Sequence, residues 1–343
     1  MTHSTLPLLE VEARGETVPG LPDELYIETT NRCNLKCRTC PQYWGMDEDA
    51  ADLTLDQVHR ILDWFPDVKR VVLHGIGEPL LNRRLPEIIA AVKRRGAYAL
   101  FNTNGLLLRG GMADAIAASG LDELRVSVDA AAPETYALVR GADGFDRIVQ
   151  NLRAFADIKG RACATNPKVS LWITGMKTNV RELPALVELA HDVGVGEVYL
   201  QRLVYSERGL AAESEALYGR SERDDLAAIR LAEERAAELG VTLRGSGEAS
   251  SSSGGLLRAA AAATYRDCRR PWTLMYVTAN GNVLPCCIAP FTGVPYGDIV
   301  LGNLFTDTAE TIWNGPRYRE WRRRMLSEQP PAACAGCGVG WSL

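Results

Sequence analysis

The chain has 343 residues, of which 46% are hydrophobic and 24% are charged, and its formal net charge is −5. This composition is typical of a globular protein that is long enough to bury a sizeable core in one large domain or two ordinary ones. There is no basic excess for nucleic acid, no apolar stretch near the ~20 residues of a membrane span and no signal peptide, so we expect a cytoplasmic protein that binds neither nucleic acid nor membrane.

Residues 1–20 look like a loose lead-in, and from residue 21 to residue 245 short β-branched runs alternate with helical patterns. We predict strands over 25–29, 70–74, 97–102, 123–128, 169–174 and 197–201. We predict helices over 54–65, 85–95, 111–119, 144–158, 180–193 and 222–239, and a further short strand over 241–244. Strands that alternate with helices form parallel sheets with right-handed crossovers. Six units are fewer than the eight of a closed barrel, so the predicted fold class is α/β, a partial (β/α)6 TIM barrel.

Residues 246–343 have a different pattern, which we interpret as a linker followed by a small α+β domain. A Gly/Ser-rich segment covers 245–255, and an alanine-rich stretch follows over 258–263. Apolar runs over 272–278 and 282–284 flank the dipeptide Asn280-Gly281, which is a strong hairpin turn signal. Near the end of the chain, a run of arginines is typical of a solvated helix face: Arg317, Arg319, Arg322, Arg323 and Arg324.

The nine cysteines of the chain are interpreted as metal ligands or catalytic thiols, because disulfide frameworks are rare in the cytoplasm. Cys33, Cys37 and Cys40 have the spacing C-x3-C-x2-C immediately after the first predicted strand. A four-iron cluster takes four ligands, so three thiolates on one loop would leave one iron open. A zinc site would need a fourth ligand close by, and neither His59 nor His74 has a ligand-like spacing.

A second set of cysteines, Cys268, Cys286, Cys334 and Cys337, spans the hairpin and a terminal C-x2-C pair. Four thiolates are able to ligate a second [4Fe–4S] cluster completely. A hairpin combined with a C-x2-C pair is also the design of a structural zinc knuckle, so the spacing alone leaves both metals open. Cys163 and Cys287 belong to neither set.

The first cysteine motif resembles that of the radical S-adenosylmethionine (radical SAM) superfamily, and the resemblance covers about residues 22–205. The stretch 75–79 is similar to the family's Gly-Gly-Glu motif, although Ile76 replaces the first of the adjacent glycines. Thr39 stands where relatives often have a larger side chain near the adenine. The resemblance implies that the cofactor S-adenosylmethionine is held by residues at the strand ends: Gly77, Glu78, Asn104, Ser127, Asp129, Arg140 and Gln201.

The tail resembles the twitch type of extension, a shortened SPASM domain, which implies iron–sulfur rather than zinc. The stretches 302–304 and 312–314 also match this extension, and its glycine spacing selects Cys286 rather than Cys287 as the hairpin ligand. The cofactors implied by both resemblances are two [4Fe–4S] clusters and S-adenosylmethionine.

The resemblance implies that S-adenosylmethionine is cleaved to a 5′-deoxyadenosyl radical, which takes a hydrogen atom from a small-molecule substrate. One auxiliary cluster in a short tail is similar to antibiotic-pathway dehydrogenases of the butirosin and spectinomycin type. We therefore predict oxidation of a secondary alcohol of an aminocyclitol or sugar to a ketone, with the auxiliary cluster as electron acceptor. An external one-electron donor, a flavodoxin or ferredoxin, is implied as a partner.

Three other functions stay open at this point. An epimerase would return a hydrogen atom from a cysteine, for which Cys287 and Cys163 are candidates, although buried cysteines are more often small hydrophobic core residues. A peptide-modifying enzyme of the same superfamily is a second alternative, and an electron carrier with two clusters is a third. The open three-cysteine site counts against the carrier, because an electron carrier gains nothing from an unligated iron.

Overall fold

The computed structural model describes residues 14–45, 47–204, 206–217, 220–245, 265–335 and 337. The predicted Gly/Ser-rich linker beyond residue 245 and the alanine-rich stretch 258–263 lie outside the described residues. Over the residues described, none of the helices combines the length and the apolar character needed to cross a membrane.

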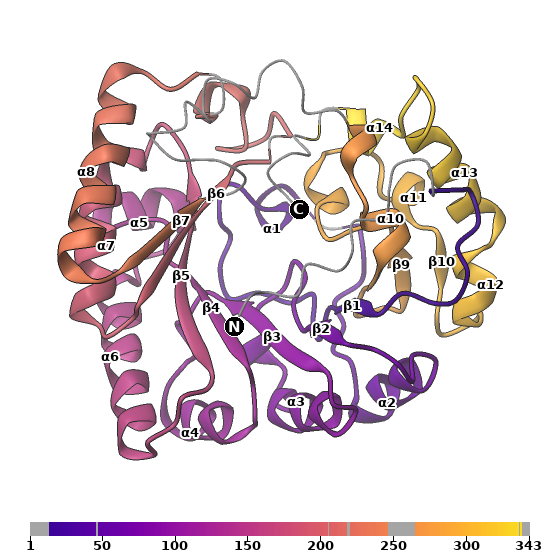
Figure 1. The fold of residues 1–343 in the computed structure, drawn as a ribbon, viewed down its shortest axis with the longest axis horizontal. Coiled ribbons are helices and arrows are strands. Elements are labelled where there is room, and N and C mark those ends of the chain that lie inside the picture. The colour runs from indigo at the N-terminus through magenta and orange to yellow at the C-terminus, as the bar shows by residue number, and fades with distance from the viewer. Residues whose placement is uncertain are drawn as a thin grey trace.

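The described strands form a single ten-stranded sheet in the order β10-β9-β8-β1-β2-β3-β4-β5-β6-β7 (Figure 1). All six strands predicted for the barrel are present, and each pairs in parallel with the next. They are β1 (Glu24–Ile27), β2 (Arg70–Val72), β3 (Tyr98–Thr103), β4 (Glu123–Ser127), β5 (Lys168–Gly175) and β6 (Glu197–Arg202). The further short strand is β7 (Thr242–Gly245), parallel to β6.

Helices cover the outside of this curved sheet, as a partial barrel requires (Figure 1). The predicted ones are α2 (Leu55–Asp63), α3 (Leu85–Arg94), α4 (Gly110–Ala118), α6 (Phe145–Arg161), α7 (Leu183–Asp192) and α8 (Arg223–Leu239). Helix α2 begins with a capping box between Thr54 and Gln57. An unpredicted helix, α5 (Pro133–Arg140), lies between β4 and α6 and ends at Gly141, whose φ is +74°. The fold class predicted from the sequence is confirmed.

The two faces of the sheet differ sharply in polarity. The outward face carries buried apolar side chains such as Ile27, Phe101 and Val126, which pack under the helices. Strand register places a ring of polar residues together on the opposite, inner face, at the carboxyl ends of the strands: Glu28, His74, Asn102, Ser127, Thr174 and Gln201. Active sites of parallel α/β folds lie at this end of the strands.

The C-terminal region extends the barrel sheet through β8 (Leu274–Val277), which pairs in parallel with β1. The predicted hairpin is present: β8 is antiparallel to β9 (Asn282–Leu284), with Gly281 at φ +80° in the turn. Beyond β9 lie α11 (Tyr296–Ile299), β10 (Gly302–Asn303), α12 (Ala309–Trp313), α13 (Pro316–Met325) and α14 (Ala332–Ala335). The barrel and the C-terminal domain therefore share one hydrogen-bonded sheet.

Two details of this region differ from the sequence-based expectations. The described part of the lead-in is not loose, because Arg14 donates to the carbonyl of Cys268 at 2.7 Å and Val18 and Asn314 exchange two hydrogen bonds of 2.9 Å. Arg322 is not on a solvated face but is fully buried. Its guanidinium donates to the carbonyls of Glu16, Trp313 and Pro271 and lies over the rings of Trp313 and Tyr318.

Replacing Arg322 should therefore destabilise the C-terminal domain. Arg322→Met keeps most of the apolar volume but leaves the two buried carbonyl groups of Pro271 and Trp313 without their donor, which should cost about 3 kcal/mol. We expect a drop in Tm of about 5–10 °C in thermal unfolding. The matched control is Arg323→Met on the same helix, where the exposed side chain pairs with Glu320 and little change is expected. Equal effects of the two substitutions would contradict this role of Arg322.

Candidate active site

The loop that follows β1 carries Cys33, Cys37 and Cys40, all partly buried. The backbone N–H of Cys40 donates to the carbonyl of Cys37 at 3.0 Å, and helix α1 (Pro41–Trp44) begins directly after Cys40. Burial raises the pKa of Cys33 to about 12 and raises that of Cys40 as well, because a thiolate is poorly solvated there. Three thiols on one turn at the carboxyl end of β1 fit the donor set of an open four-iron site.

A buried ion pair fixes this loop to the neighbouring strands. Arg140 approaches the Cys37 sulfur at 3.6 Å and forms an ion pair of 2.9 Å with Asp129. Asp129 has a positive φ of 62°, and its carboxylate accepts from the backbone N–H of Thr174 at 2.6 Å. Burial alone would lower the pKa of Arg140, but Asp129 and Cys37 raise it above its usual value. A permanent cation therefore lies beside Cys37, where it would strengthen a hydrogen bond to a thiolate.

Glu78 and Gly77 join the loop after β2 to the cysteine loop. The Glu78 carboxylate is buried and accepts from the Thr103 hydroxyl at 2.6 Å and from the Asn104 backbone N–H at 2.7 Å. Burial raises the pKa of Glu78 above its usual value. A Cβ atom at Gly77 would overlap the carbonyl of Thr30, so only glycine permits this approach.

The other cofactor residues predicted from the sequence lie around the same end of the sheet. The side chain of Asn104 donates to Asn34 of the cysteine loop at 2.8 Å. Gln201 lies 3.5 Å from the hydroxyl of Thr174, and Ser127 is on the inner face by strand register. The structure thus brings the predicted residues together; that they contact S-adenosylmethionine stays a prediction.

Glu28, which was not singled out in the sequence, joins the barrel to the C-terminal domain. Its buried carboxylate accepts from the backbone N–H of Ile76 at 2.6 Å and of Ala279 at 3.2 Å, and the Tyr276 hydroxyl lies 3.4 Å away. A Cβ atom at Gly75 would overlap both Glu28 and Tyr276. Burial raises the pKa of Glu28 to about 7. The end of β1, the loop after β2 and the β8–β9 hairpin therefore meet at one carboxyl group.

Glu48 makes a second junction between the cysteine loop and the hairpin. Its carboxylate accepts from the Thr278 hydroxyl at 2.8 Å and from the Asn282 amide at 2.7 Å. Next to it, the carbonyl of Asp49 accepts from Asn280 at 2.9 Å and from Asn31 at 2.8 Å. The hairpin that leads to Cys286 is thus held against the loop that carries the first three cysteines.

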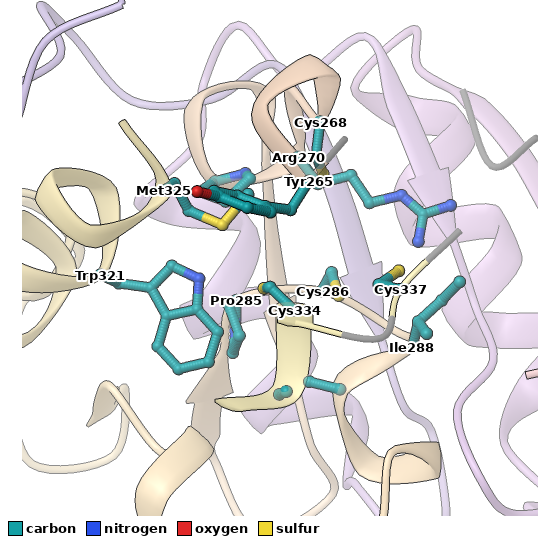
Figure 2. A pocket seen from close by; sticks show the side chains of 13 residues that line it. Tyr265, Cys268, Arg270, Pro285, Cys286, Ile288, Trp321, Met325, Cys334 and Cys337 are labelled. Carbon is teal, nitrogen blue, oxygen red and sulfur yellow. The ribbon is translucent and has the colours of Figure 1, made fainter. Parts of the chain in front are cut away.

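The second cysteine set lines one cavity of the C-terminal domain, together with Arg270, Trp321 and Met325 (Figure 2). Cys268, Cys286 and the Cys334–Cys337 pair reach this cavity from three different segments. Burial raises the pKa of Cys268 to about 11 and that of Cys337 to about 12, and neighbouring thiols add to the rise. Four cysteines around a largely apolar cavity fit a fully ligated four-iron cluster.

The two remaining cysteines differ in their surroundings. Cys163 is exposed in the turn between α6 and β5, at the opposite end of the strands from the cysteine loop, so it is no candidate for chemistry at this site. Cys287 is partly buried, and its neighbours include the Tyr26 hydroxyl and the guanidinium of Arg270. Tyr26 belongs to β1 of the barrel, and β1 pairs with β8 of the C-terminal domain. Cys287, which lies beside Tyr26, is therefore at the boundary between the two domains.

The sequence analysis did not identify three residues of the site: Glu28, Tyr276 and Arg270. One signal was available for Glu28: Glu24, Tyr26 and Glu28 alternate with apolar residues along β1, which marks a polar inner face. No local pattern marks Tyr276 or Arg270, since each is placed by a partner far away in the chain.

Comparison with known proteins gives two family matches. A model of the radical SAM superfamily matches residues 27–198, and a model of the SPASM iron–sulfur cluster-binding domain matches residues 268–338. These ranges contain all seven cysteines of the two sets.

Three similar proteins show how much of the chain the similarity covers. The tungsten-containing aldehyde ferredoxin oxidoreductase cofactor-modifying protein of Pyrococcus furiosus is 28% identical over 184 residues, which is 52% of this chain and 51% of that protein. The PqqA peptide cyclase of Gluconobacter oxydans is 26% identical over 330 residues, covering 93% and 84%. The crystal structure of Streptococcus suis SuiB bound to S-adenosylmethionine superposes with a TM-score of 0.67 at 19% identity, covering 90% and 69%. This chain thus spans only about half of the Pyrococcus protein.

The assignment of the two cysteine sets predicts the metal content. After anaerobic reconstitution we expect about eight irons per chain, falling to about four in the triple variant Cys33→Ala, Cys37→Ala, Cys40→Ala. Iron, sulfide and zinc are measured on the same samples. Cys163→Ala, which removes an exposed cysteine, should keep all eight. About four irons in the wild type, with zinc in the tail, would contradict the second iron–sulfur site.

The raised pKa of Glu28 predicts a pH dependence of stability. In the folded protein the pKa is about 7, against an ordinary value of 4.5. Its contribution is therefore fully present below about pH 4.5 and is lost as the pH rises through about 7. Relative to Glu28→Gln, the wild type should lose up to about 3 kcal/mol between pH 5 and pH 8 in urea unfolding. Glu310→Gln, at an exposed position, is the control, and a pH-independent difference would contradict the prediction.

Proposed function

Because the chain belongs to the radical SAM superfamily, we propose that it cleaves S-adenosylmethionine and oxidises a secondary alcohol of an aminocyclitol or sugar-like substrate to a ketone. The observation that carries the proposal is the fixed relation between two cysteine sets. The loop of Cys33, Cys37 and Cys40 follows β1, and the segment that leads to Cys286 follows β8, the strand paired with β1. A radical site and a separate one-electron site on adjoining strands suit a two-electron oxidation.

At the barrel site, the chain's own residues would bind and orient the cofactor. A four-iron cluster held by Cys33, Cys37 and Cys40, once reduced by one electron from outside the chain, would supply the radical chemistry that removes a hydrogen atom from the substrate. The Glu78 carboxylate accepts from Thr103, Leu80 and Asn104, which leaves one lone pair on Oε2 to accept from an ammonium group. Arg140 would compensate the negative charge at Cys37.

Alcohol oxidation needs a place for one more electron. Loss of a hydrogen atom from the alcohol-bearing carbon leaves one proton and one electron to be removed before the carbonyl forms. Cys268, Cys286, Cys334 and Cys337 would hold a cluster, which supplies a one-electron acceptor. The set of four cysteines, similar to that of aminocyclitol dehydrogenases, is what favours an alcohol as the substrate.

A peptide is the second candidate substrate. The match to PqqA peptide cyclase extends over 93% of this chain and 84% of that protein. The same two sites would then serve the oxidation of a peptide side chain.

Epimerisation is the third candidate, and Cys287 is the observation that favours it. Its thiol lies beside the Tyr26 hydroxyl on the barrel side of the C-terminal domain. A thiol there would be able to return a hydrogen atom to a substrate radical, whereas Cys163 is too far from the site to do so.

The proposal predicts both cofactor cleavage and the fate of the substrate hydrogen. The reduced holoenzyme should convert S-adenosylmethionine to methionine and 5′-deoxyadenosine, and Cys37→Ala should abolish this while Cys163→Ala retains it. With an aminocyclitol alcohol, the product should lack two hydrogens, as measured by mass spectrometry. Deuterium uptake from D2O at an unoxidised carbon, lost in Cys287→Ala, would instead establish epimerisation. Intact clusters and a reductant without any 5′-deoxyadenosine would rule out the radical function.

A further inference from the structure

The loop of Cys33, Cys37 and Cys40 exposes basic side chains between its cysteines. Lys36 and Arg38 flank Cys37 directly, and both are exposed while the cysteines are partly buried. Arg32 is exposed as well, but it pairs with Asp52. No carboxylate of the described chain lies within ion-pair distance of Lys36 or Arg38. Two exposed cations without a carboxylate partner therefore flank Cys37 in the loop, in a chain whose net charge is −5.

Two further segments lie against this loop and enlarge the exposed surface. The N–H of Arg38 donates to the carbonyl of Val139 at 2.9 Å, and the carbonyl of Arg38 accepts from the N–H of Leu210 at 2.8 Å. A Cβ atom at Gly209 would overlap the Arg38 carbonyl and lie 3.2 Å from the ring of Tyr43. The segments around residues 139 and 209 and helix α1 thus adjoin the cysteine loop.

These segments add a third cation and two exposed apolar side chains. Arg208 is exposed, and its guanidinium lies 6.0 Å from the ring centre of Trp44. Tyr43 and Leu138 are 49% and 39% exposed, which places them among the few large hydrophobic residues that the described surface leaves open. We call this set, Lys36, Arg38, Tyr43, Leu138 and Arg208, the loop face.

Exposed carboxylates of Glu134, Asp143 and Glu207 adjoin the loop face, whose own three cations have no ion-pair partner among the described residues. Glu207 directly precedes Arg208, and its carboxylate accepts from the backbone N–H of Glu213 at 3.0 Å while keeping its negative charge. Glu134 is exposed one helical turn before Leu138. Three cations around an exposed aromatic and an exposed leucine have the composition of a protein interface: an apolar centre with arginine and a charged rim.

We propose that the loop face is the docking surface for an acidic one-electron carrier protein. The inference rests on the proposed function, in which each cleavage of S-adenosylmethionine consumes one electron from outside the chain. The carrier would be oxidised by one electron and the site at Cys33, Cys37 and Cys40 reduced by one. The loop face lies on the loop that carries this site, and its three cations would steer an acidic partner toward it.

The test compares two reductants on the same reconstituted holoenzyme. The variant Lys36→Glu, Arg38→Glu, Arg208→Glu is mixed anaerobically with reduced flavodoxin or with dithionite, and bleaching of the cluster absorbance is followed by stopped flow. We expect reduction by flavodoxin to slow about tenfold or more at low salt and to lose its salt dependence. Reduction by dithionite, and 5′-deoxyadenosine formation with it, should stay at the wild-type rate.

The matched control reverses three exposed cations elsewhere on the barrel: Arg94→Glu, Arg153→Glu, Arg161→Glu. It changes the net charge by the same amount and should leave reduction by flavodoxin almost unchanged. If the loop-face variant loses iron, the neutral variant Lys36→Gln, Arg38→Gln, Arg208→Gln replaces it. A wild-type rate with flavodoxin in a variant of full iron content, or an equal loss in the control, would overturn the docking surface. Failure of dithionite to give 5′-deoxyadenosine in the wild type would overturn the proposed function instead.

Discussion

The carboxyl group of Glu28 joins three segments that the chain brings together from positions far apart in the sequence. It accepts hydrogen bonds from Ile76 in the loop after β2 and from Ala279 in the β8–β9 hairpin, while its own strand leads into the first cysteine loop. Each neighbour carries part of the site, since Glu78 follows Ile76 and Cys286 follows the hairpin. The positions of both cysteine sets thus depend on the same few atoms. A buried acceptor of backbone N–H groups has no replacement once it is removed, which makes this junction costly to alter.

Most of the fold could be predicted from the sequence because each strand and helix has a recognisable local pattern of residues. The β-branched runs that became β1 to β6 are buried, and the helices between them carry apolar stripes that pack on the outer face of the sheet. Asn280-Gly281 predicted the hairpin because a left-handed residue is needed in that turn. Helix α5 was missed, since eight residues that begin with a proline differ little from a loop in sequence.

Some residues of the site could be found from short motifs, whereas others are placed by partners far away in the sequence. The cysteine spacings, Gly77, Glu78 and Asp129 were found from short motifs, and the structure gathers them at one end of the sheet. Tyr276 is 248 residues away from Glu28, and Arg322 is 306 residues away from the carbonyl of Glu16 that it binds. Within the arginine run, nothing local distinguishes the one buried guanidinium from its exposed neighbours, because burial is decided by what packs against the helix.

Because β8 pairs with β1, the barrel sheet is not complete until the C-terminal part of the chain has been synthesised on the ribosome. Strand β1 can pair with β2 as soon as residue 72 is available, but its other edge stays open until β8 has been made, about 200 residues later. At 5–20 residues per second, that edge remains unpaired for roughly ten to forty seconds. An open strand edge invites pairing with other chains. The nascent barrel is therefore most vulnerable to aggregation before its C-terminal domain emerges, and a chaperone would be most useful in that interval.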